Sequence, residues 1–180
     1  VPTQIVKKNP KKANKINYLG TKILIDELIK LKKIKWFFFS STSHVYKFSQ
    51  KRLDEKSRLK PSSLYGLTKL KAEKYIQKKL KKEKIPFCIG RIFSFTHKKQ
   101  TADFVIPSII KKAKSKKKIV YFENTEHYRD FLSTGDICNA INILFKKKAN
   151  GIYNIGSGKK VLISDIIKLI FKKYKKIYII

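Results

Sequence analysis

The stretch from Trp36 to Lys69 limits most strongly what this chain can fold into. An uninterrupted apolar run, Trp36 to Phe39, ends in the three hydroxyl residues Ser40-Ser41-Thr42. A strand that is buried on both faces of a parallel sheet is continuously apolar, because helices cover both sides. We therefore expect a buried strand at residues 36–40 that delivers hydroxyl groups at its carboxyl edge.

A helix predicted from Ser63 to about Lys82 carries Tyr65 and Lys69. Residues four apart lie on one helix face, so the phenol and the ammonium can serve one site. A nearby ammonium favours the phenolate, which lowers the pKa of a tyrosine and allows proton exchange near neutral pH.

The Tyr-x-x-x-Lys spacing has little weight alone, because 9 Tyr and 40 Lys (44 basic residues less four Arg) give about two matches by chance. The chain contains three such pairs, Tyr18/Lys22, Tyr65/Lys69 and Tyr75/Lys79. Only the second stands at a helix start behind a strand that ends in hydroxyls. This structural context, and not the spacing, makes Tyr65/Lys69 the candidate catalytic pair.

Five stretches together resemble the extended short-chain dehydrogenase/reductase family, in its NAD-dependent epimerase/dehydratase branch that acts on nucleotide sugars. They are Asn17-Tyr18-Leu19-Gly20-Thr21, Ser40 to Tyr46, Pro61 to Lys69, Arg129-Asp130-Phe131 with Gly135-Asp136-Ile137, and Gly151 to Gly158. Their order and separations match the family over nearly the whole chain. The resemblance implies an α/β fold, a partial Rossmann-like doubly wound parallel sheet without its N-terminal strands, and a small α/β substrate-binding lobe.

The resemblance also implies a division of the chain. Residues 1–92 would form the C-terminal half of the dinucleotide-binding Rossmann domain. Residues 93–180 would form mainly the substrate-binding lobe, with returning segments at about 127–145 that pack on the Rossmann part.

The hydrophobic pattern predicts further elements along the chain. A helix capped by Asn14 would bury an apolar stripe made of Ile16, Leu19, Ile23, Leu24, Leu28 and Leu31. Strands are expected at 87–92 and 119–122, and helices at 104–114, 134–145 and 165–174. Thr134 and Ser164 would cap the last two helices.

The resemblance assigns roles to individual residues. Thr42 would hydrogen-bond the sugar oxygen that undergoes redox, Tyr65 would exchange a proton with it, and Lys69 would lower the pKa of Tyr65 and hold the cofactor ribose. Asn17 and Ser40 would join Tyr65 and Lys69 around the cofactor, and Ser94 and Arg129 would join Thr42 around the substrate. Three of these residues have a structural alternative. Asn17 could serve as a helix cap, Thr42 could be part of a turn, and Arg129 could pair with Asp130 in a structural ion pair.

The segments Arg91 to Gln100 and Asp103 to Ser108 are similar to those of GDP-4-dehydro-6-deoxy-mannose reductases. Ser94 stands where that group has an Asn, and His97-Lys98 where it has Gly-Pro, which weakens the expected grip on the nucleotide diphosphate. The expected reaction is NAD(P)-dependent reduction at C4 of a GDP-4-keto-6-deoxy sugar, with a nucleotide-sugar 4-epimerase as the alternative. Ser43-His44 stands where 4,6-dehydratases have an acidic pair, which argues against a dehydratase.

The formal net charge of +32 suggests a second class of function, a non-catalytic basic remnant that binds nucleic acid. The lysines are spread through the whole chain, whereas dedicated binders concentrate Arg and stacking aromatics on one face. We therefore expect a solvated surface and no specific nucleic-acid partner. The expected partners are a nucleotide sugar, with GDP-sugars favoured, and a second copy in a homodimer.

No Gly-x-x-Gly-x-x-Gly turn occurs in the 180 residues, so the cradle for the pyrophosphate of NAD or NADP is not part of this sequence. We expect the chain alone to bind nicotinamide cofactor weakly.

The chain has no Met and begins Val1-Pro2, which suggests a longer reading frame. No apolar run is long enough for a membrane span, and Cys88 and Cys138 have no metal-site spacing, so we expect a cytoplasmic protein with two buried thiols and no metal.

Overall fold

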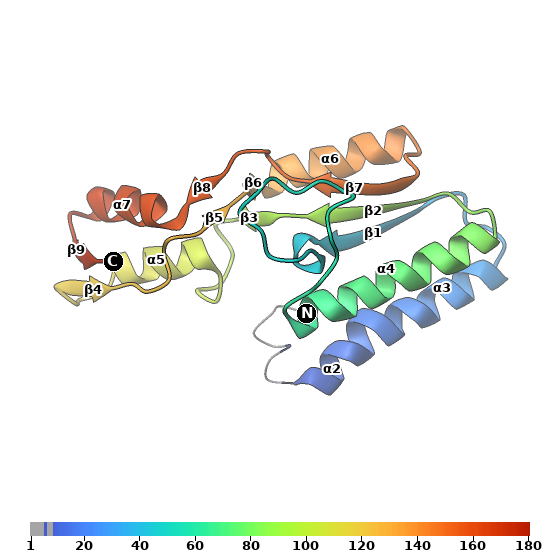
Figure 1. Cartoon of the computed structure of the whole chain (residues 1–180), viewed down its shortest axis with the longest axis horizontal. Helices are drawn as coiled ribbons and strands as arrows, with labels where there is room; N and C mark the ends of the chain where they lie inside the picture. Colours follow the sequence, from blue (N-terminus) through green and yellow to red (C-terminus); the bar gives the residue numbers. More distant parts are fainter. Residues whose placement is uncertain (1–5, 7–8) are drawn as a thin grey trace. The chain divides into compact units, whose positions relative to one another are not determined.

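The computed structural model describes residue 6 and residues 9–180 (Figure 1). The chain divides into two compact units. The first comprises Val1–Phe93 and Ile137–Ile155, and the second Ser94–Asp136 and Gly156–Ile180.

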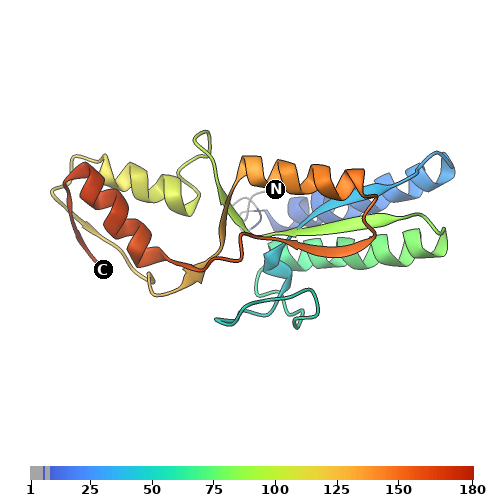
Figure 2. The same cartoon turned by 90° about the horizontal axis from the view of Figure 1, so that it is seen from above.

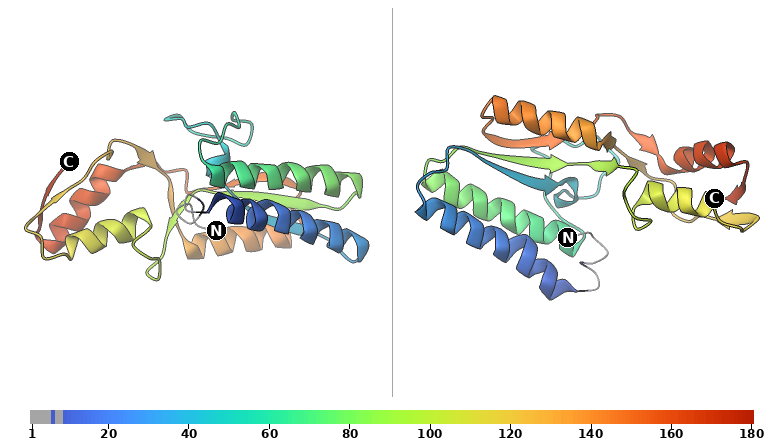
Figure 3. Two further views of the ribbon diagram at one scale, coloured as in Figure 1. Left: turned by 90° about the horizontal axis from the view of Figure 1, so that it is seen from below. Right: turned by 180° about the vertical axis from the view of Figure 1, so that it is seen from behind.

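The first unit is built on a parallel sheet of three strands in the order β1-β2-β7. The strands are β1 (Phe37–Thr42), β2 (Phe87–Ile92) and β7 (Gly151–Ile155). Helices α3 (Thr21–Lys30) and α4 (Leu64–Lys82) cover one face, and α6 (Thr134–Lys146) covers the other (Figure 3). The buried core on the α3–α4 side consists of Ile25, Phe39, Ala72, Ile76, Leu80, Phe87 and Ile89. The expected α/β arrangement with a parallel sheet is confirmed.

The N-terminal helical segment differs from the prediction. It consists of α2 (Pro10–Asn14), a π-helix η1 (Lys15–Gly20) and α3. The cap is Asn9, whose side chain accepts a hydrogen bond from the Lys12 amide at 3.0 Å, and not Asn14. Residues 1–5, 7 and 8, which precede this segment, lie outside the described residues.

The stripe that was predicted to be buried on this segment is mostly exposed. A π-turn has more residues per turn than an α-helix, so it rotates the following side chains away from a 3.6-residue pattern. The buried positions are Ala13, Asn17 and Ile25, each four or eight residues from the last. The exposed positions are Ile16, Leu19, Ile23, Leu24 and Leu31, which are 40–62% accessible.

Helix α4 begins and ends where the sequence predicts. Ser63 is its cap and accepts a hydrogen bond from the Gly66 amide at 3.1 Å. Ser, Thr, Asp and Asn are favoured at this position because their oxygens satisfy an otherwise unpaired backbone N–H. The polar segment before it leaves the sheet as a long loop (Figure 2).

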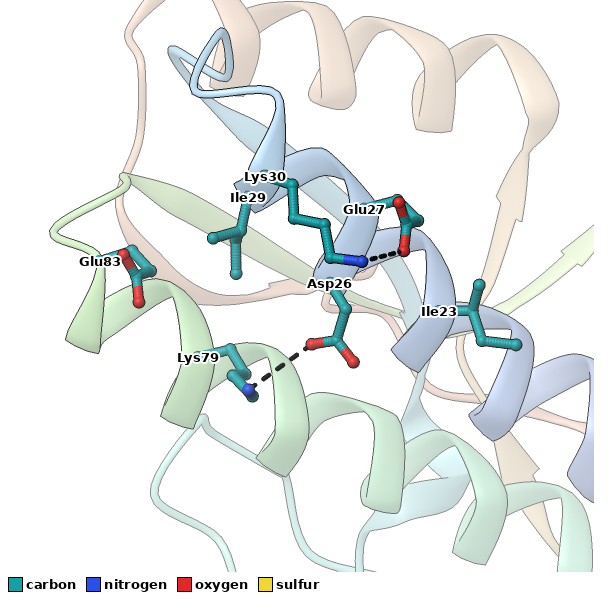
Figure 4. A pocket seen from close by; sticks show the side chains of 7 residues that line it. All are labelled: Ile23, Asp26, Glu27, Ile29, Lys30, Lys79 and Glu83. Carbon is teal, nitrogen blue, oxygen red and sulfur yellow. Dashed lines mark hydrogen bonds and ion pairs between the residues drawn. The ribbon is translucent and has the colours of Figure 1, made fainter.

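Three residues of the two other Tyr-x-x-x-Lys pairs contact one carboxylate, and the fourth, Tyr18, packs edge-on against the ring of Tyr75. Asp26 on α3 accepts a hydrogen bond from the Tyr75 hydroxyl at 2.5 Å and binds the ammonium groups of Lys22 at 2.9 Å and Lys79 at 3.6 Å. The contact with Lys79 crosses a pocket of about 370 Å³ between α3 and α4 (Figure 4). These two pairs therefore hold two helices together, and none of Thr42, Tyr65 or Lys69 lines this pocket.

Asp26 makes the stability of the chain depend on pH. The Tyr75 hydroxyl, and then the Lys22 ammonium, lower the pKa of Asp26 from 3.8 to about 2. A carboxyl group whose pKa is lower in the folded state stabilises the fold above its ordinary pKa, and this contribution is lost as the pH falls through the folded value. We expect Asp26→Asn to reduce the free energy of unfolding at pH 7 and the difference from wild type to disappear between about pH 4 and pH 2.

Urea unfolding of both proteins along this pH range measures the difference. Glu27→Gln is the matched control, because Glu27 forms an exposed ion pair with Lys30 on the same helix. A difference between Asp26→Asn and wild type that does not change with pH would show that the charge of Asp26 is not what stabilises the helix pair.

The second unit contains two packed helices, α5 (Val105–Ala113) and α7 (Ile163–Tyr174), which lie side by side in Figures 1 and 2. Its paired strands are β3 (Ser94–Thr96) with β6 (Phe131–Ser133), β4 (Ile119–Tyr121) with β9 (Ile177–Ile179), and β5 (Tyr128–Arg129) with β8 (Val161–Leu162). The first two pairs are parallel and the third is antiparallel. The buried core consists of Ile109, Ala113, Val120, Ile163, Ile167 and Phe171.

Both predicted caps of the C-terminal helices are wrong. At the start of α6, Ser133 and not Thr134 accepts a hydrogen bond from the Asp136 amide, at 3.1 Å. The Asp136 carboxylate in turn accepts hydrogen bonds from the Ser133 amide and hydroxyl. Ser164 lies inside α7, where its side chain is buried and its amide donates to the carbonyl of Thr125.

One of the two cysteines is not buried. Cys88 on β2 is inaccessible, and burial raises the pKa of its thiol to about 11, which makes it unreactive near neutral pH. Cys138 is exposed, because α6 buries only Ile137. Within the described part of the chain no three His, Cys, Asp or Glu side chains gather as a metal site would require, and no helix is both long and apolar enough to cross a membrane.

Candidate active site

The carboxyl end of β1 places Thr42 beside Tyr65. Thr42 is the last residue of β1 and is only 5% exposed. Its hydroxyl accepts a hydrogen bond from the His44 amide at 3.3 Å, so it also caps the short 3₁₀ helix η2 (Ser43–Val45). The same side chain is near enough to Tyr65 to lower the pKa of its phenol. Thr42 is therefore both part of a turn and a contact of the predicted catalytic tyrosine.

Lys69 lies one turn along α4 from Tyr65 and is directed at the end of the same strand. Its ammonium donates to the backbone carbonyl of Ser40 at 2.7 Å and stands 4.6 Å from the centre of the Phe39 ring. Burial lowers the pKa of Lys69, and the charge of Glu73 opposes this shift. The structure thus brings Ser40, Thr42, Tyr65 and Lys69 to one sheet edge, as the sequence predicts.

The electrostatics of Tyr65 differ from the prediction. Burial raises the pKa of its phenol, and Thr42 lowers it to a smaller extent. Burial and Thr42 are the causes that set the pKa of Tyr65, and the ammonium of Lys69 donates to the Ser40 carbonyl. A raised pKa keeps the phenol protonated at neutral pH, which suits a proton donor.

Gly66 allows α4 to begin in contact with the turn that follows β1. A Cβ atom at this position would lie 2.2 Å from the carbonyl oxygen of His44. This close approach holds Tyr65 next to the turn, with its ring edge-on to that of His44 at 5.7 Å between centroids.

Asn17 connects the π-turn to the same region of α4. Its side-chain amide donates to the Thr68 hydroxyl at 3.2 Å, and that hydroxyl donates to the Tyr65 carbonyl at 2.9 Å. Asn17 is 6% exposed and lies inside η1, so it is not a helix cap. Short π-helical turns are frequent at functional sites, and here the turn presents Asn17 to the helix that carries the tyrosine.

A buried ion pair behind these residues was not identified from the sequence. Arg91 on β2 and Glu73 on α4 are 1% and 0% exposed in their side chains and meet at 2.7 Å. The Ser41 hydroxyl donates to the same carboxylate at 2.5 Å, and the guanidinium also donates to the Tyr46 hydroxyl at 2.9 Å. Glu73 follows Lys69 at the i+4 spacing, which puts both on one helix face, but no spacing in the sequence indicates the contact with Arg91.

The second unit contains Ser94 and Arg129, the two further residues predicted to bind substrate. Ser94 on β3 is paired in register with Phe131, two residues beyond Arg129. Burial lowers the pKa of Arg129, and its Nε donates to His127 Nε2 at 3.5 Å.

The structural ion pair between Arg129 and Asp130 is not formed. The Asp130 carboxylate instead accepts hydrogen bonds from the amides of Ser157 and Gly158, both at 2.8 Å, and from the Ser157 hydroxyl at 2.7 Å. Among the residues that the structure describes, no carboxylate forms an ion pair with Arg129. A half-buried guanidinium without an anionic partner is suited to phosphate oxygens.

The model of the NAD dependent epimerase/dehydratase family matches residues 6–156. The chain belongs to this family. Dictyostelium discoideum dTDP-D-glucose 4,6-dehydratase is 30% identical over an alignment of 167 positions, which covers 86% of this chain and 38% of the relative. Escherichia coli dTDP-4-dehydro-6-deoxyglucose reductase is 29% identical over an alignment of 147 positions, which covers 79% of this chain and 46% of the relative. The chain spans about half the length of the curated relatives it matches, or less.

Solved structures confirm the fold. RMD from Pseudomonas aeruginosa, complexed with NADPH, matches 99% of this chain with a TM-score of 0.90 at 23% identity, over 65% of its own length. A Thermotoga maritima UDP-glucose 4-epimerase with UDP-glucose matches 98% of this chain with a TM-score of 0.83, also at 23% identity, over 60% of its own length. The Rossmann-like assignment is therefore correct.

Proposed function

We propose that the protein containing this chain transfers hydride between a nicotinamide cofactor and C4 of a nucleotide-activated sugar. The observation that supports this most directly is the contact of Thr42 with Tyr65 at the carboxyl edge of a parallel sheet, with Lys69 one turn away. Thr42 orients the sugar oxygen, Tyr65 exchanges a proton with it, and Lys69 holds the cofactor ribose. The first unit would then be the dinucleotide-binding part and the second the substrate lobe.

Reduction is the favoured direction. When a ketone is reduced, its oxygen must gain a proton, and Tyr65 can supply one because its phenol is protonated at neutral pH. The similarity of residues 91–108 to the mannose-type reductases favours a GDP-4-keto-6-deoxy sugar. Arg129, together with Ser94, would bind the diphosphate in the second unit.

Dehydration is disfavoured although several curated relatives are dehydratases by name. The 4,6-dehydratases have an acidic pair for the elimination of water, and Ser43-His44 stands in its place here. The next carboxylates along the chain have other partners, since Asp54 accepts hydrogen bonds from Lys56 and Ser57, and Glu55 accepts one from the Asn154 amide.

A 4-epimerase is the second candidate, because it needs the same three residues and regenerates its own cofactor. Curated relatives of this chain include an epimerase, the uncharacterized UDP-glucose epimerase of Bacillus subtilis, which is 30% identical over 139 residues. Steady-state consumption of NADPH with a 4-keto sugar nucleotide would identify a reductase. Interconversion of two sugar nucleotides without net redox would identify an epimerase.

The residues present fit one end of the family's cofactor. Lys69 and the Ser40 carbonyl lie at the sheet edge with hydrogen-bonding groups for a ribose, and Tyr65 adds a phenol beside them. The cofactor, NAD or NADP, would supply or accept the hydride. Its pyrophosphate needs a glycine-rich turn that these 180 residues do not contain, so activity should be assayed on the full reading frame that includes this chain.

In the full-length protein, Tyr65→Phe is expected to reduce kcat by about 10²- to 10⁴-fold, because the substitution removes the proton donor. Initial rates of NADPH oxidation with a 4-keto sugar nucleotide measure the effect. Tyr18→Phe is the matched control, since Tyr18 has the same spacing to a lysine, and it should leave the rate unchanged. Undiminished turnover in Tyr65→Phe would refute the proposal.

The nucleic-acid alternative predicts a different pattern. Binding of duplex DNA would weaken steeply with salt, because each released counterion adds to the salt dependence. Tyr65→Phe would leave this binding unchanged. Duplex DNA binding that is lost as the salt concentration rises, without any turnover in the full-length protein, would favour this alternative.

A homodimer is part of the proposal, and the exposed apolar side chains of η1 and α3 are its suggested interface. Ile16, Leu19 and Ile23 are 48%, 40% and 60% exposed, and Leu67 on α4 is 40% exposed. We expect Ile23→Glu to convert a dimer to a monomer in light scattering after size-exclusion chromatography. Phe48→Glu, at a 72% exposed position in the polar loop, is the control and should remain dimeric. A wild-type monomer would refute the interface.

A cytoplasmic location completes the proposal. Both cysteines, Cys88 and Cys138, are free thiols, as expected in a reducing compartment.

A further inference from the structure

Glu73 is the only fully buried carboxylate in the described part of the chain, and three elements converge on it. Arg91 Nε lies 3.2 Å from both of its oxygens, and Arg91 Nη2 lies 2.7 Å from Oε2. The Ser41 hydroxyl donates to Oε1. The carboxylate therefore ties α4 to the carboxyl ends of β1 and β2.

We propose that Glu73 is the positioning residue of this site: it fixes the end of β1 against α4, where Lys69 donates to the Ser40 carbonyl, and places its negative charge on the helix face that carries Lys69. This inference rests on the proposed function for the role of Lys69, whereas the contacts themselves do not depend on it. Glu73 would contact neither substrate nor cofactor.

The geometry gives Glu73 this influence in two ways. First, Tyr65, Lys69 and Glu73 follow one another at intervals of four residues, so they share one face of α4. Second, Ser41 lies between Ser40 and Thr42 in β1. The hydrogen bond from the Ser41 hydroxyl to Glu73 therefore restrains Ser40 and Thr42. The Ser40 carbonyl accepts a hydrogen bond from Lys69, and Thr42 lies beside Tyr65.

The charge of Glu73 acts on a lysine that burial would otherwise discharge. Burial lowers the pKa of Lys69, and Glu73 raises it. The groups that face Glu73 are Lys69 on its own helix, Ser41 from β1 and Arg91 from β2, and Tyr46 is joined to it through Arg91. Of these groups, Lys69 is the one that the proposed function needs in its charged form. Its ammonium forms no ion pair among the described residues.

Trace acetylation of the 180-residue chain with acetic anhydride over a range of pH, followed by peptide mass spectrometry, measures the titration midpoint of individual lysines. This readout needs neither substrate nor cofactor. In Glu73→Gln the midpoint of Lys69 is expected to move to lower pH, because the neutral amide no longer stabilises the ammonium. Glu73→Asp, which keeps the charge, is expected to restore the midpoint toward that of the wild type.

Glu27→Gln is the matched control. Glu27 raises the pKa of Lys30 through an exposed hydrogen bond on α3, so this variant should lower the midpoint of Lys30 and leave that of Lys69 unchanged. It shows that the method detects the loss of one carboxylate and that the effect on Lys69 is specific to Glu73.

Glu73→Gln leaves Arg91 buried without a counter-charge, so the fold of each variant is first checked by circular dichroism. If the single variant does not fold, Glu73→Gln/Arg91→Gln removes both charges. The midpoint of Lys69 is then expected to fall by less than in the single variant, because loss of the Arg91 cation opposes loss of the Glu73 carboxylate. An unchanged Lys69 midpoint in either folded protein would overturn the proposal. Undiminished turnover in Tyr65→Phe would instead refute the proposed function and leave this result standing.

Discussion

Arg91→Met is expected to lower the free energy of unfolding of the chain by about 3–5 kcal/mol, because it leaves the Glu73 carboxylate buried without a counter-charge. The pair is almost inaccessible, at 1% and 0% side-chain exposure, so water cannot replace the guanidinium. The substitution also removes the donor to the Tyr46 hydroxyl. Urea unfolding monitored by circular dichroism measures the change.

The double variant Glu73→Leu/Arg91→Met separates the cost of an unpaired charge from the value of the pair. Replacing both partners with apolar residues of similar size is often close to neutral, since no charge then remains buried. We expect the double variant to recover most of the lost stability. Lys30→Met, which breaks an exposed pair with Glu27, is the control and should leave the urea midpoint unchanged. A single variant as stable as wild type would mean that Glu73 is not held as a charged group.

The sequence predicted the elements whose signals are local. Helix α4 begins after Ser63 because a serine hydroxyl can satisfy a free amide at that position, and residues 87–92 form β2 as their apolar run indicates. The α2–α3 segment was misjudged because nothing in a 3.6-residue pattern announces a π-turn. The apolar residues on its exposed side fit the 3.6-residue pattern equally well, because such a pattern shows that a helix face is apolar and not what covers it.

The candidate site was predicted to the extent that it depends on short-range spacing. Tyr65 and Lys69 are brought to Thr42 as expected, and their catalytic roles remain predictions. The contact between Glu73 and Arg91 could not be predicted from the sequence. The two residues are 18 positions apart, and their contact depends on how α4 lies on the sheet. The protonation of Tyr65 was misjudged for the same reason, since burial is a property of the packed structure and the ammonium of Lys69 is bound elsewhere.

Gly66→Ala is the second substitution with a large expected effect, and two opposing terms decide its sign. Alanine is favoured over glycine inside a helix by about 0.8–1 kcal/mol. At Gly66, however, the new Cβ would lie 2.2 Å from the carbonyl oxygen and 2.9 Å from the carbonyl carbon of His44. Both atoms belong to the backbone, so the turn or the helix start must move, and overpacking of this kind typically costs about 1–3 kcal/mol or more.

We therefore expect Gly66→Ala to destabilise the chain despite the better helix former, and to separate Tyr65 from Thr42. Urea unfolding gives the first effect, and a change in the Tyr65 ¹³Cζ resonance on specific tyrosine labelling gives the second. Gly20→Ala is the matched control, because a Cβ there would make only an ordinary contact, 3.5 Å from the Lys15 carbonyl oxygen. It should be neutral or slightly stabilising. Equal changes in the free energy of unfolding for Gly66→Ala and Gly20→Ala would mean that helix propensity, and not the contact with His44, determines the outcome. In that case the close packing of α4 on the turn would not be what holds Tyr65 in place.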